Sequence, residues 1–131
     1  MFSAEELAFL MRNELCRLAT VDRRGWPHVV PVCYIFTKGA FYMVTDLGTK
    51  KLGNLQTDPR AALLVDTYKP NRAVLVRGRA QLLLSGPEFM EVTELFMRKF
   101  AWARADPWQE NEAAIIKLVP EAKVSWGLGR A

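Results

Sequence analysis

Most of this chain consists of short, apolar, strand-like segments that follow one another through tight turns, and this pattern restricts its fold more than any other feature. Turns such as 22–25 and 37–39 are too short to hold a crossover helix, so neighbouring strands must run antiparallel. We therefore expect an all-β fold, an antiparallel barrel of six to seven strands with two or three peripheral helices. The strand-like segments are 15–21, 27–36, 40–45, 60–68, 73–84, 113–119 and 122–128.

Three segments carry helix signals instead. Residues 3–6 form a capping box that opens an amphipathic helix, and residues 85–88 read as a second capping box before another. Between them, a short helix follows Gly48 and should end near Thr57, because Pro59 disfavours helical geometry at the preceding residue. Pro31 and Gly78 interrupt their strands and predict an edge or bulge and a bend.

Composition limits the protein classes that remain. The chain has 131 residues, half of them hydrophobic, which suits one folded domain over 1–131. Its apolar runs are too short to span a membrane, and Glu5 and Glu6 stand where a signal peptide would be basic. The net charge of +4 is dispersed, so we expect no nucleic-acid partner. Cys16 and Cys33 lack metal or redox spacing, which indicates free thiols in the cytoplasm.

The sequence offers little for metal or side-chain catalysis. His28 is the only histidine, so a zinc site or a histidine-dependent triad is poorly supported and we expect no metal ligand and no catalytic residue. Any catalysis should depend on a bound cofactor.

The segment 41–51 runs a strand directly into a helix whose first turn carries Lys50 and Lys51. That turn presents free N–H groups and a partial positive charge, so paired lysines there indicate that an anion is bound. A phosphate could satisfy the N–H groups, the hydroxyls of Thr45 and Thr49 and both ammonium groups. The alternative is that the two lysines are simply solvated.

Together, the segments 18–22, 25–32, 41–51, 54–55 and 58–65 resemble the pyridoxamine 5'-phosphate oxidase-like, FMN-binding split-barrel superfamily. The most specific part is the Thr-x-x-Gly-Thr-Lys-Lys block, followed by Asn-Leu and Asp-Pro-Arg. The resemblance implies a split β-barrel, a homodimer and two FMN molecules at the subunit interface, each contacted by both chains.

The resemblance also assigns roles to residues. Thr45, Thr49, Lys50 and Lys51 would meet the cofactor phosphate. The ring would rest against residues of the second strand, namely Val30, Pro31, Val32 and Cys33. Trp126 is a candidate aromatic wall, either in its own site or in the partner's, and is equally well explained as a barrel plug; His28 could be an ordinary strand residue.

The chain departs from the vitamin B6 oxidases in two ways. Those enzymes place an arginine and a lysine where this chain has Val30 and Ile35, and they carry a C-terminal segment that is not found before Ala131. We therefore expect an FMN-dependent oxidoreductase acting on a small molecule other than a B6 vitamer. Two alternatives stay open, a reductase that uses the deazaflavin coenzyme F-420 and a non-catalytic flavin-binding protein.

Overall fold

A computed structural model describes residues 1–129 of the chain. Seven strands form one antiparallel sheet in the order β2-β1-β5-β6-β7-β4-β3. The elements, in chain order, are α1 (Ala4–Arg12), β1 (Leu15–Val21), β2 (Pro27–Cys33), β3 (Ile35–Thr37), β4 (Ala40–Asp46), α2 (Lys50–Thr57), β5 (Arg60–Thr67), β6 (Arg72–Leu83), α3 (Pro87–Lys99), α4 (Ala101–Ala105) and β7 (Ala113–Trp126). This confirms the antiparallel all-β split barrel predicted from the sequence.

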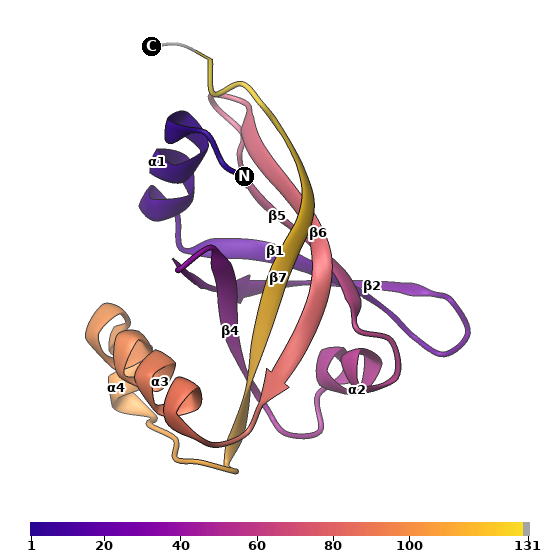
Figure 1. Ribbon diagram of the computed structural model, residues 1–131, viewed down its shortest axis with the longest axis vertical. Coiled ribbons are helices and arrows are strands. Elements are labelled where there is room, and N and C mark those ends of the chain that lie inside the picture. The colour runs from indigo at the N-terminus through magenta and orange to yellow at the C-terminus, as the bar shows by residue number, and fades with distance from the viewer. Residues whose placement is uncertain (130–131) are drawn as a thin grey trace.

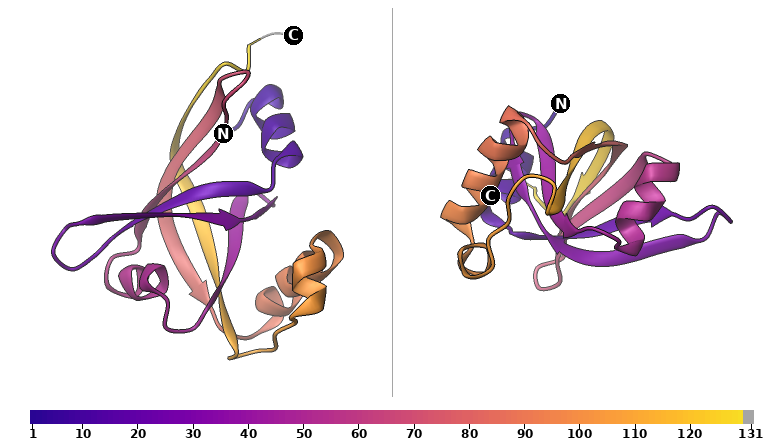
Figure 2. Two further views of the ribbon diagram at one scale, coloured as in Figure 1. Left: turned by 180° about the vertical axis from the view of Figure 1, so that it is seen from behind. Right: turned by 90° about the horizontal axis from the view of Figure 1, so that it is seen from below.

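The sheet is strongly curled, so that β1 and β2 run across the direction of β6 and β7 (Figure 1). Its concave side holds the larger core, which includes Leu18, Phe41, Leu63 and Val76. A smaller core lies on the other side of β4, where α3 and α4 pack against it (Figure 2). Helix α2 lies near the C-terminal end of β4, on the side opposite to α3 and α4 (Figure 1). The sheet and its outer helices thus leave the end of β4 between two helical elements.

Tyr34 connects β2 and β3, the two edge strands of the sheet. The sequence predicts one strand over 27–36, but the chain pairs with β1 as far as Cys33 and with β4 from Ile35 onward. At the switch, the buried Tyr34 hydroxyl donates to the Leu10 carbonyl oxygen at 2.7 Å. The single predicted strand is therefore two strands, because one segment pairs with two different partners. Strand β2 is a sheet edge, as Pro31 predicted.

Strand β7 is continuous, and the prediction of two closing strands around Pro120 is wrong. Instead, the register between β6 and β7 shifts at Arg77 and Gly78, opposite Pro120. A side chain at Gly78 would collide with the backbone of Val119, so the close approach requires glycine. The bulge absorbs the proline within one long strand.

The helix starts agree with the sequence in one case and differ in another. Ser3 and Glu6 form the predicted capping box of α1. Helix α3 begins with Pro87 after Gly86, whose φ of 98° positions the chain, and no side chain caps it. The second capping box, predicted at residues 85–88, is therefore wrong. Within residues 1–129, no helix is long and apolar enough to cross a membrane.

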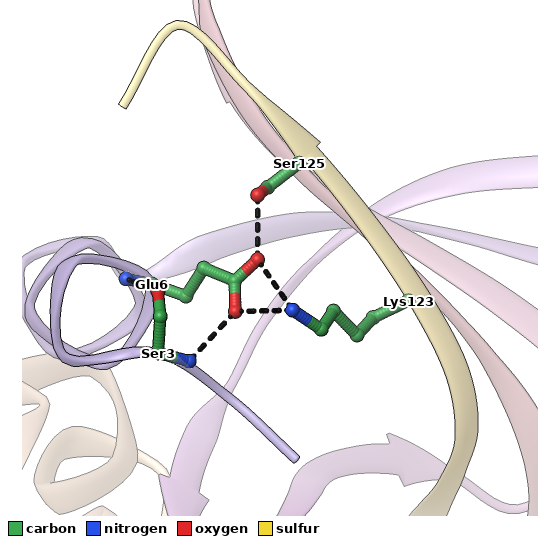
Figure 3. Close-up of polar contacts among 4 residues, drawn as sticks. All are labelled: Ser3, Glu6, Lys123 and Ser125. Carbon is green, nitrogen blue, oxygen red and sulfur yellow. Dashed lines mark hydrogen bonds and ion pairs between the residues drawn. The ribbon is translucent and has the colours of Figure 1, made fainter. Parts of the chain in front are cut away.

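Helix α1 is fastened to β7 by a buried ionic cluster (Figure 3). The Glu6 carboxylate, only 4% exposed, accepts two hydrogen bonds from Lys123 Nζ at 2.7 and 2.9 Å. It also accepts one from the Ser125 hydroxyl and one from the Ser3 backbone N–H. The first helix and the last strand are thereby joined by contacts between residues that are far apart in sequence.

Candidate functional site

The strand β4 leads into α2 through a tight turn that leaves the helix start open. Gly48 has a φ of 85° in this turn, and Thr49 is the N-cap of α2. The Thr49 hydroxyl does not cap the helix, because it lies 2.8 Å from the hydroxyl of the buried Thr45. The first turn also contains no acidic residue. The free N–H groups and partial positive charge of this turn are therefore available to an anion.

The two lysines of this turn face different hollows. Lys51 shares a cavity of about 520 Å³ with Thr45 and Thr49. Lys50 lines a neighbouring cavity of about 650 Å³, beside the turn between β1 and β2, where its Nζ lies 3.9 Å from Asp22 Oδ2. Adjacent residues on a helix do not face the same way, which explains the divergence. The structure thus brings Thr45, Thr49 and Lys51 together and sets Lys50 apart.

We call the first cavity the β4–α4 hollow, because α4 and the loop after it form its far wall. That wall carries two aromatic side chains, Trp102 and Trp108. Three carboxylates also border the cavity and could accept hydrogen bonds from ligand hydroxyls. The residues lining it are Val44, Thr45, Asp46, Thr49, Lys51, Trp102, Asp106, Pro107, Trp108, Glu112 and Ala113. An anion-binding end facing an aromatic wall suits a phosphorylated molecule with a planar ring.

We call the second cavity the basic hollow. Arg23 and Arg24, at the turn between β1 and β2, line it together with Lys50 and Asp22. The Asp22 carboxylate accepts backbone hydrogen bonds from Trp26 and Arg24, which lower its pKa, so it stays ionised. The hollow therefore carries more positive than negative charge and adjoins the first one at Thr49.

The predicted ring-binding residues of β2 line neither hollow. Val30 and Val32 pair with the buried Leu18 and Cys16 and so face the concave side of the sheet. Pro31 and Cys33 face the opposite side. One of them approaches the β4–α4 hollow indirectly, since Cys33 packs against the smaller core, whose Phe100 stacks on Trp102.

Both cysteines are free thiols, with Cys16 buried and Cys33 half-buried. Burial raises the pKa of Cys16 to about 12. Burial also raises the pKa of Cys33, and the nearby Trp102 indole only partly offsets this. A reactive thiol needs a lowered pKa, so neither cysteine is activated as a nucleophile.

Two further candidate residues lie away from these hollows. Trp126 is at the end of β7, twelve residues beyond Ala114, which pairs with Thr45. That strand length is about 40 Å, so within one chain Trp126 does not reach the β4–α4 hollow. Its indole N–H donates to Asn71 Oδ1 at 3.2 Å. His28 pairs with Thr20, and its Nδ1 is enclosed without a hydrogen-bond partner.

Trp102 and Trp108 were not among the site residues predicted from the sequence. The only local sign is that the two tryptophans flank the helix break at Asp106-Pro107. Among residues 1–129, no group of three or more histidine, cysteine or acidic side chains is arranged to hold a metal ion.

Comparison with known proteins identifies the family to which the chain belongs. The sequence profile described as pyridoxamine 5'-phosphate oxidase matches residues 2–126, almost the whole chain. The chain belongs to the pyridoxamine 5'-phosphate oxidase family. The family assignment agrees with the split barrel and with the strand-to-helix motif at the start of α2.

Several relatives show how far the family likeness extends. The pyridoxine/pyridoxamine 5'-phosphate oxidase of Citrobacter koseri is 29% identical over 101 residues, which cover 76% of this chain and 44% of the relative. The chain thus matches less than half the length of that enzyme. A 5a,11a-dehydrotetracycline/5a,11a-dehydrooxytetracycline reductase of Streptomyces rimosus is 34% identical over 94 residues, covering 65% of this chain and 66% of the relative.

Solved structures share the fold at lower identity. The heme storage protein HutZ of Vibrio cholerae superimposes with a TM-score of 0.81 at 16% identity, covering 95% of this chain and 94% of its own. At this identity the likeness concerns the fold alone. The same fold is therefore found in a heme storage protein.

The two positions at which the resemblance to the vitamin B6 oxidases would place positive charges are apolar here. Ile35 is buried in the smaller core beneath α3, and Val30 is half-buried opposite Leu18. Neither position can contribute a positive charge to a phosphate. The cationic groups near the start of α2 are Lys50, Lys51 and the two arginines of the basic hollow.

Proposed function

We propose that this protein is a flavin-nucleotide-dependent oxidoreductase that binds FMN in the β4–α4 hollow and acts on a small-molecule substrate. One observation carries the proposal: an uncapped helix start, two hydroxyls and Lys51 share a cavity with an aromatic wall. These groups match the phosphate and the planar ring of one ligand. Family membership and the reductase relative support the same reaction class.

The protein's own groups would bind and orient the cofactor. Lys51 and the first-turn N–H groups of α2 hold the phosphate, while the hydroxyls of Thr45 and Thr49 complete its hydrogen bonds. Carboxylates at the hollow's rim, such as Glu112, accept hydrogen bonds from the sugar-alcohol chain. The flavin itself supplies the hydride chemistry, so no side-chain base is needed.

A homodimer is the second part of the proposal. The convex face of the sheet exposes Leu75 and Val124 on the neighbouring strands β6 and β7, and Val29 on the edge strand β2. Leu75 pairs directly with Val124 and with Leu64, so these three side chains form one continuous surface. Such a surface suits a two-fold contact with a second copy. The partner's Trp126 would then be free to approach the site, as the family resemblance implies.

The alternative cofactor is the deazaflavin coenzyme F-420, and the basic hollow favours it. Arg23, Arg24 and Lys50 adjoin the β4–α4 hollow and could hold the acidic tail of that longer molecule. FMN has a single phosphate and no acidic tail, so it would not need to bind in the basic hollow. The two cofactors therefore differ in whether they use the basic hollow.

Heme is bound by a structural relative and is less well supported here. Heme iron usually takes an axial ligand from the protein. His28 is the only histidine in the sequence, and its Nδ1 is enclosed within the sheet.

The test is the absorption spectrum of the protein purified without added cofactor, followed by titration with FMN, with F-420 and with heme. We expect one flavin-type ligand per chain, in a particle of twice the chain's mass by light scattering. A protein that binds neither flavin nor deazaflavin would overturn the proposal. A Soret band that shows one heme bound per chain would instead identify the protein as a heme-binding protein.

A further inference from the structure

We propose that Trp102 is the side chain on which the planar ring of the bound cofactor stacks, so that α4 determines ring binding. This inference rests on the proposed function. It moves the role of the aromatic wall from Trp126, and from β2 alone, to α4, a helix that was not predicted from the sequence.

The position of Trp102 links the two separated parts of the predicted site. It lines the β4–α4 hollow together with Thr45, Thr49 and Lys51. Trp102 also stacks on Phe100, a member of the smaller core against which Cys33, the last residue of β2, packs. A ring that extends from the phosphate-binding end toward β2 therefore passes over Trp102.

The Trp102 side chain packs against other aromatic rings and is also partly exposed to solvent. Phe100, 5% exposed, stacks on it with ring centroids 5.2 Å apart and an interplanar angle of 29°. The ring of Trp108 also lies nearly parallel to that of Trp102, with centroids 6.3 Å apart and an interplanar angle of 23°. Trp108 is held in place by a hydrogen bond from its indole N–H to the Thr93 hydroxyl. Trp102 itself remains 43% exposed. A fixed aromatic ring with open surface loses little conformational freedom when a ligand stacks on it.

The other two exposed tryptophans, Trp26 and Trp126, do not line the β4–α4 hollow. Trp26 is 69% exposed beside the turn between β1 and β2 and lines neither cavity. Trp126 lies at the far end of β7. Trp26 therefore offers a matched control for the removal of an exposed indole.

The experiment compares FMN with riboflavin, which has the same ring and no phosphate. Trp102→Ala should weaken the binding of both ligands by about tenfold, because stacking on an aromatic side chain contributes at this scale. Trp102→Phe should recover most of that affinity. Lys51→Gln should weaken FMN binding and leave riboflavin unchanged, and Trp26→Ala should change neither.

Fluorescence gives a second measurement that a merely structural role would not alter. Indole quenches flavin emission when the rings stack, whereas a phenyl ring does not, so flavin bound to Trp102→Phe should emit more strongly than flavin bound to the parent. Thermal melts establish whether each variant is folded. If Trp102→Ala does not fold, Trp102→Phe still tests the inference. Parent-like affinity and quenching in Trp102→Phe and Trp102→Ala would overturn the inference alone. A parent that binds neither ligand would overturn the proposed function together with it.

Discussion

The carboxylate of Glu6 is buried and fully engaged in hydrogen bonds, so its ionisation is coupled to folding. Burial alone would raise the pKa of this carboxyl, but hydrogen bonds from Lys123, Ser125 and Ser3 lower it from 4.5 to about 2. A folded-state pKa below the unfolded value stabilises the protein above the unfolded pKa. That stability should therefore be present above pH 4.5 and be lost as the pH falls toward about 2.

We expect Glu6→Gln to lower the free energy of unfolding at neutral pH by about 3 kcal/mol, from about 1.4 kcal/mol for each pH unit of the lowered pKa. The difference from the parent should fall below about 1 kcal/mol near pH 2, where about half of the parent carboxyl is protonated. Urea denaturation at both pH values measures this. Glu91→Gln is the control, because Glu91 pairs with Lys38 on the surface and should matter by less than about 1 kcal/mol. An equal loss at both pH values would show that packing, not charge, is responsible.

The separation of the two lysines at the start of α2 predicts unequal roles. Lys51→Gln should weaken FMN binding by about tenfold or more, since a desolvated charge-assisted hydrogen bond contributes roughly 1.5–3 kcal/mol. Lys50→Gln should weaken FMN binding much less, because Lys50 faces the basic hollow. Calorimetric titration of each variant with FMN and with F-420 measures the difference. Equal losses of FMN affinity would show that one phosphate contacts both lysines.

At the scale of elements, the bulge between β6 and β7 is set by a single glycine. Gly78→Ala places a methyl group against the Val119 backbone, which cannot move without disturbing two strands. We expect a loss of about 3 kcal/mol in unfolding free energy, at the upper end of the usual overpacking cost. Gly53→Ala in α2 is the control, because its Cβ would meet open space. It should stabilise the protein by about 0.5–1 kcal/mol through helix propensity. Urea denaturation at one protein concentration measures both, and a neutral Gly78→Ala would show that the bulge can relax.

The sequence predicted most elements because their signals are local. Residues 15–21 and the helix ending at Thr57 agree with the structure, since alternation and Pro59 define them directly. The break at Tyr34 and the unbroken β7 depend on which strands pair, and no local pattern around Pro120 records that pairing.

The candidate site was predictable only in part, for the same reason. Thr45, Thr49 and Lys51 lie within one short motif, so their proximity follows from the strand-to-helix connection. Trp102 reaches the hollow because α4 packs beside β4, more than fifty residues away along the chain. Contacts of that kind come from tertiary packing and carry no sequence spacing.

At the scale of the whole molecule, the convex sheet face predicts association of two chains. Leu75→Glu places a charge at the centre of the apolar surface, beside Val124, and should convert the dimer to a monomer because burying an unpaired charge is costly. Light scattering measures the mass. Met90→Glu, an exposed apolar position on α3, is the control and should leave the dimer intact.

Cofactor binding provides a second measurement on the same pair of variants. If the partner's Trp126 helps to complete the site, monomeric Leu75→Glu should bind FMN more weakly than dimeric Met90→Glu. A parent protein that is monomeric with FMN present would contradict the shared-site arrangement.

The place of β7 in the sheet has a consequence for how the protein is made on the ribosome. Among the seven strands of the sheet, β7 comes last along the chain, yet it joins β6 to the β4–β3 hairpin and holds α1 through Lys123. Until it emerges, the nascent chain consists of two sheet fragments with unpaired edges, which are prone to aggregate. Native structure should therefore form late, in one step, and a chain ended by a stop codon before Ala113 should be recovered with chaperones or in inclusion bodies.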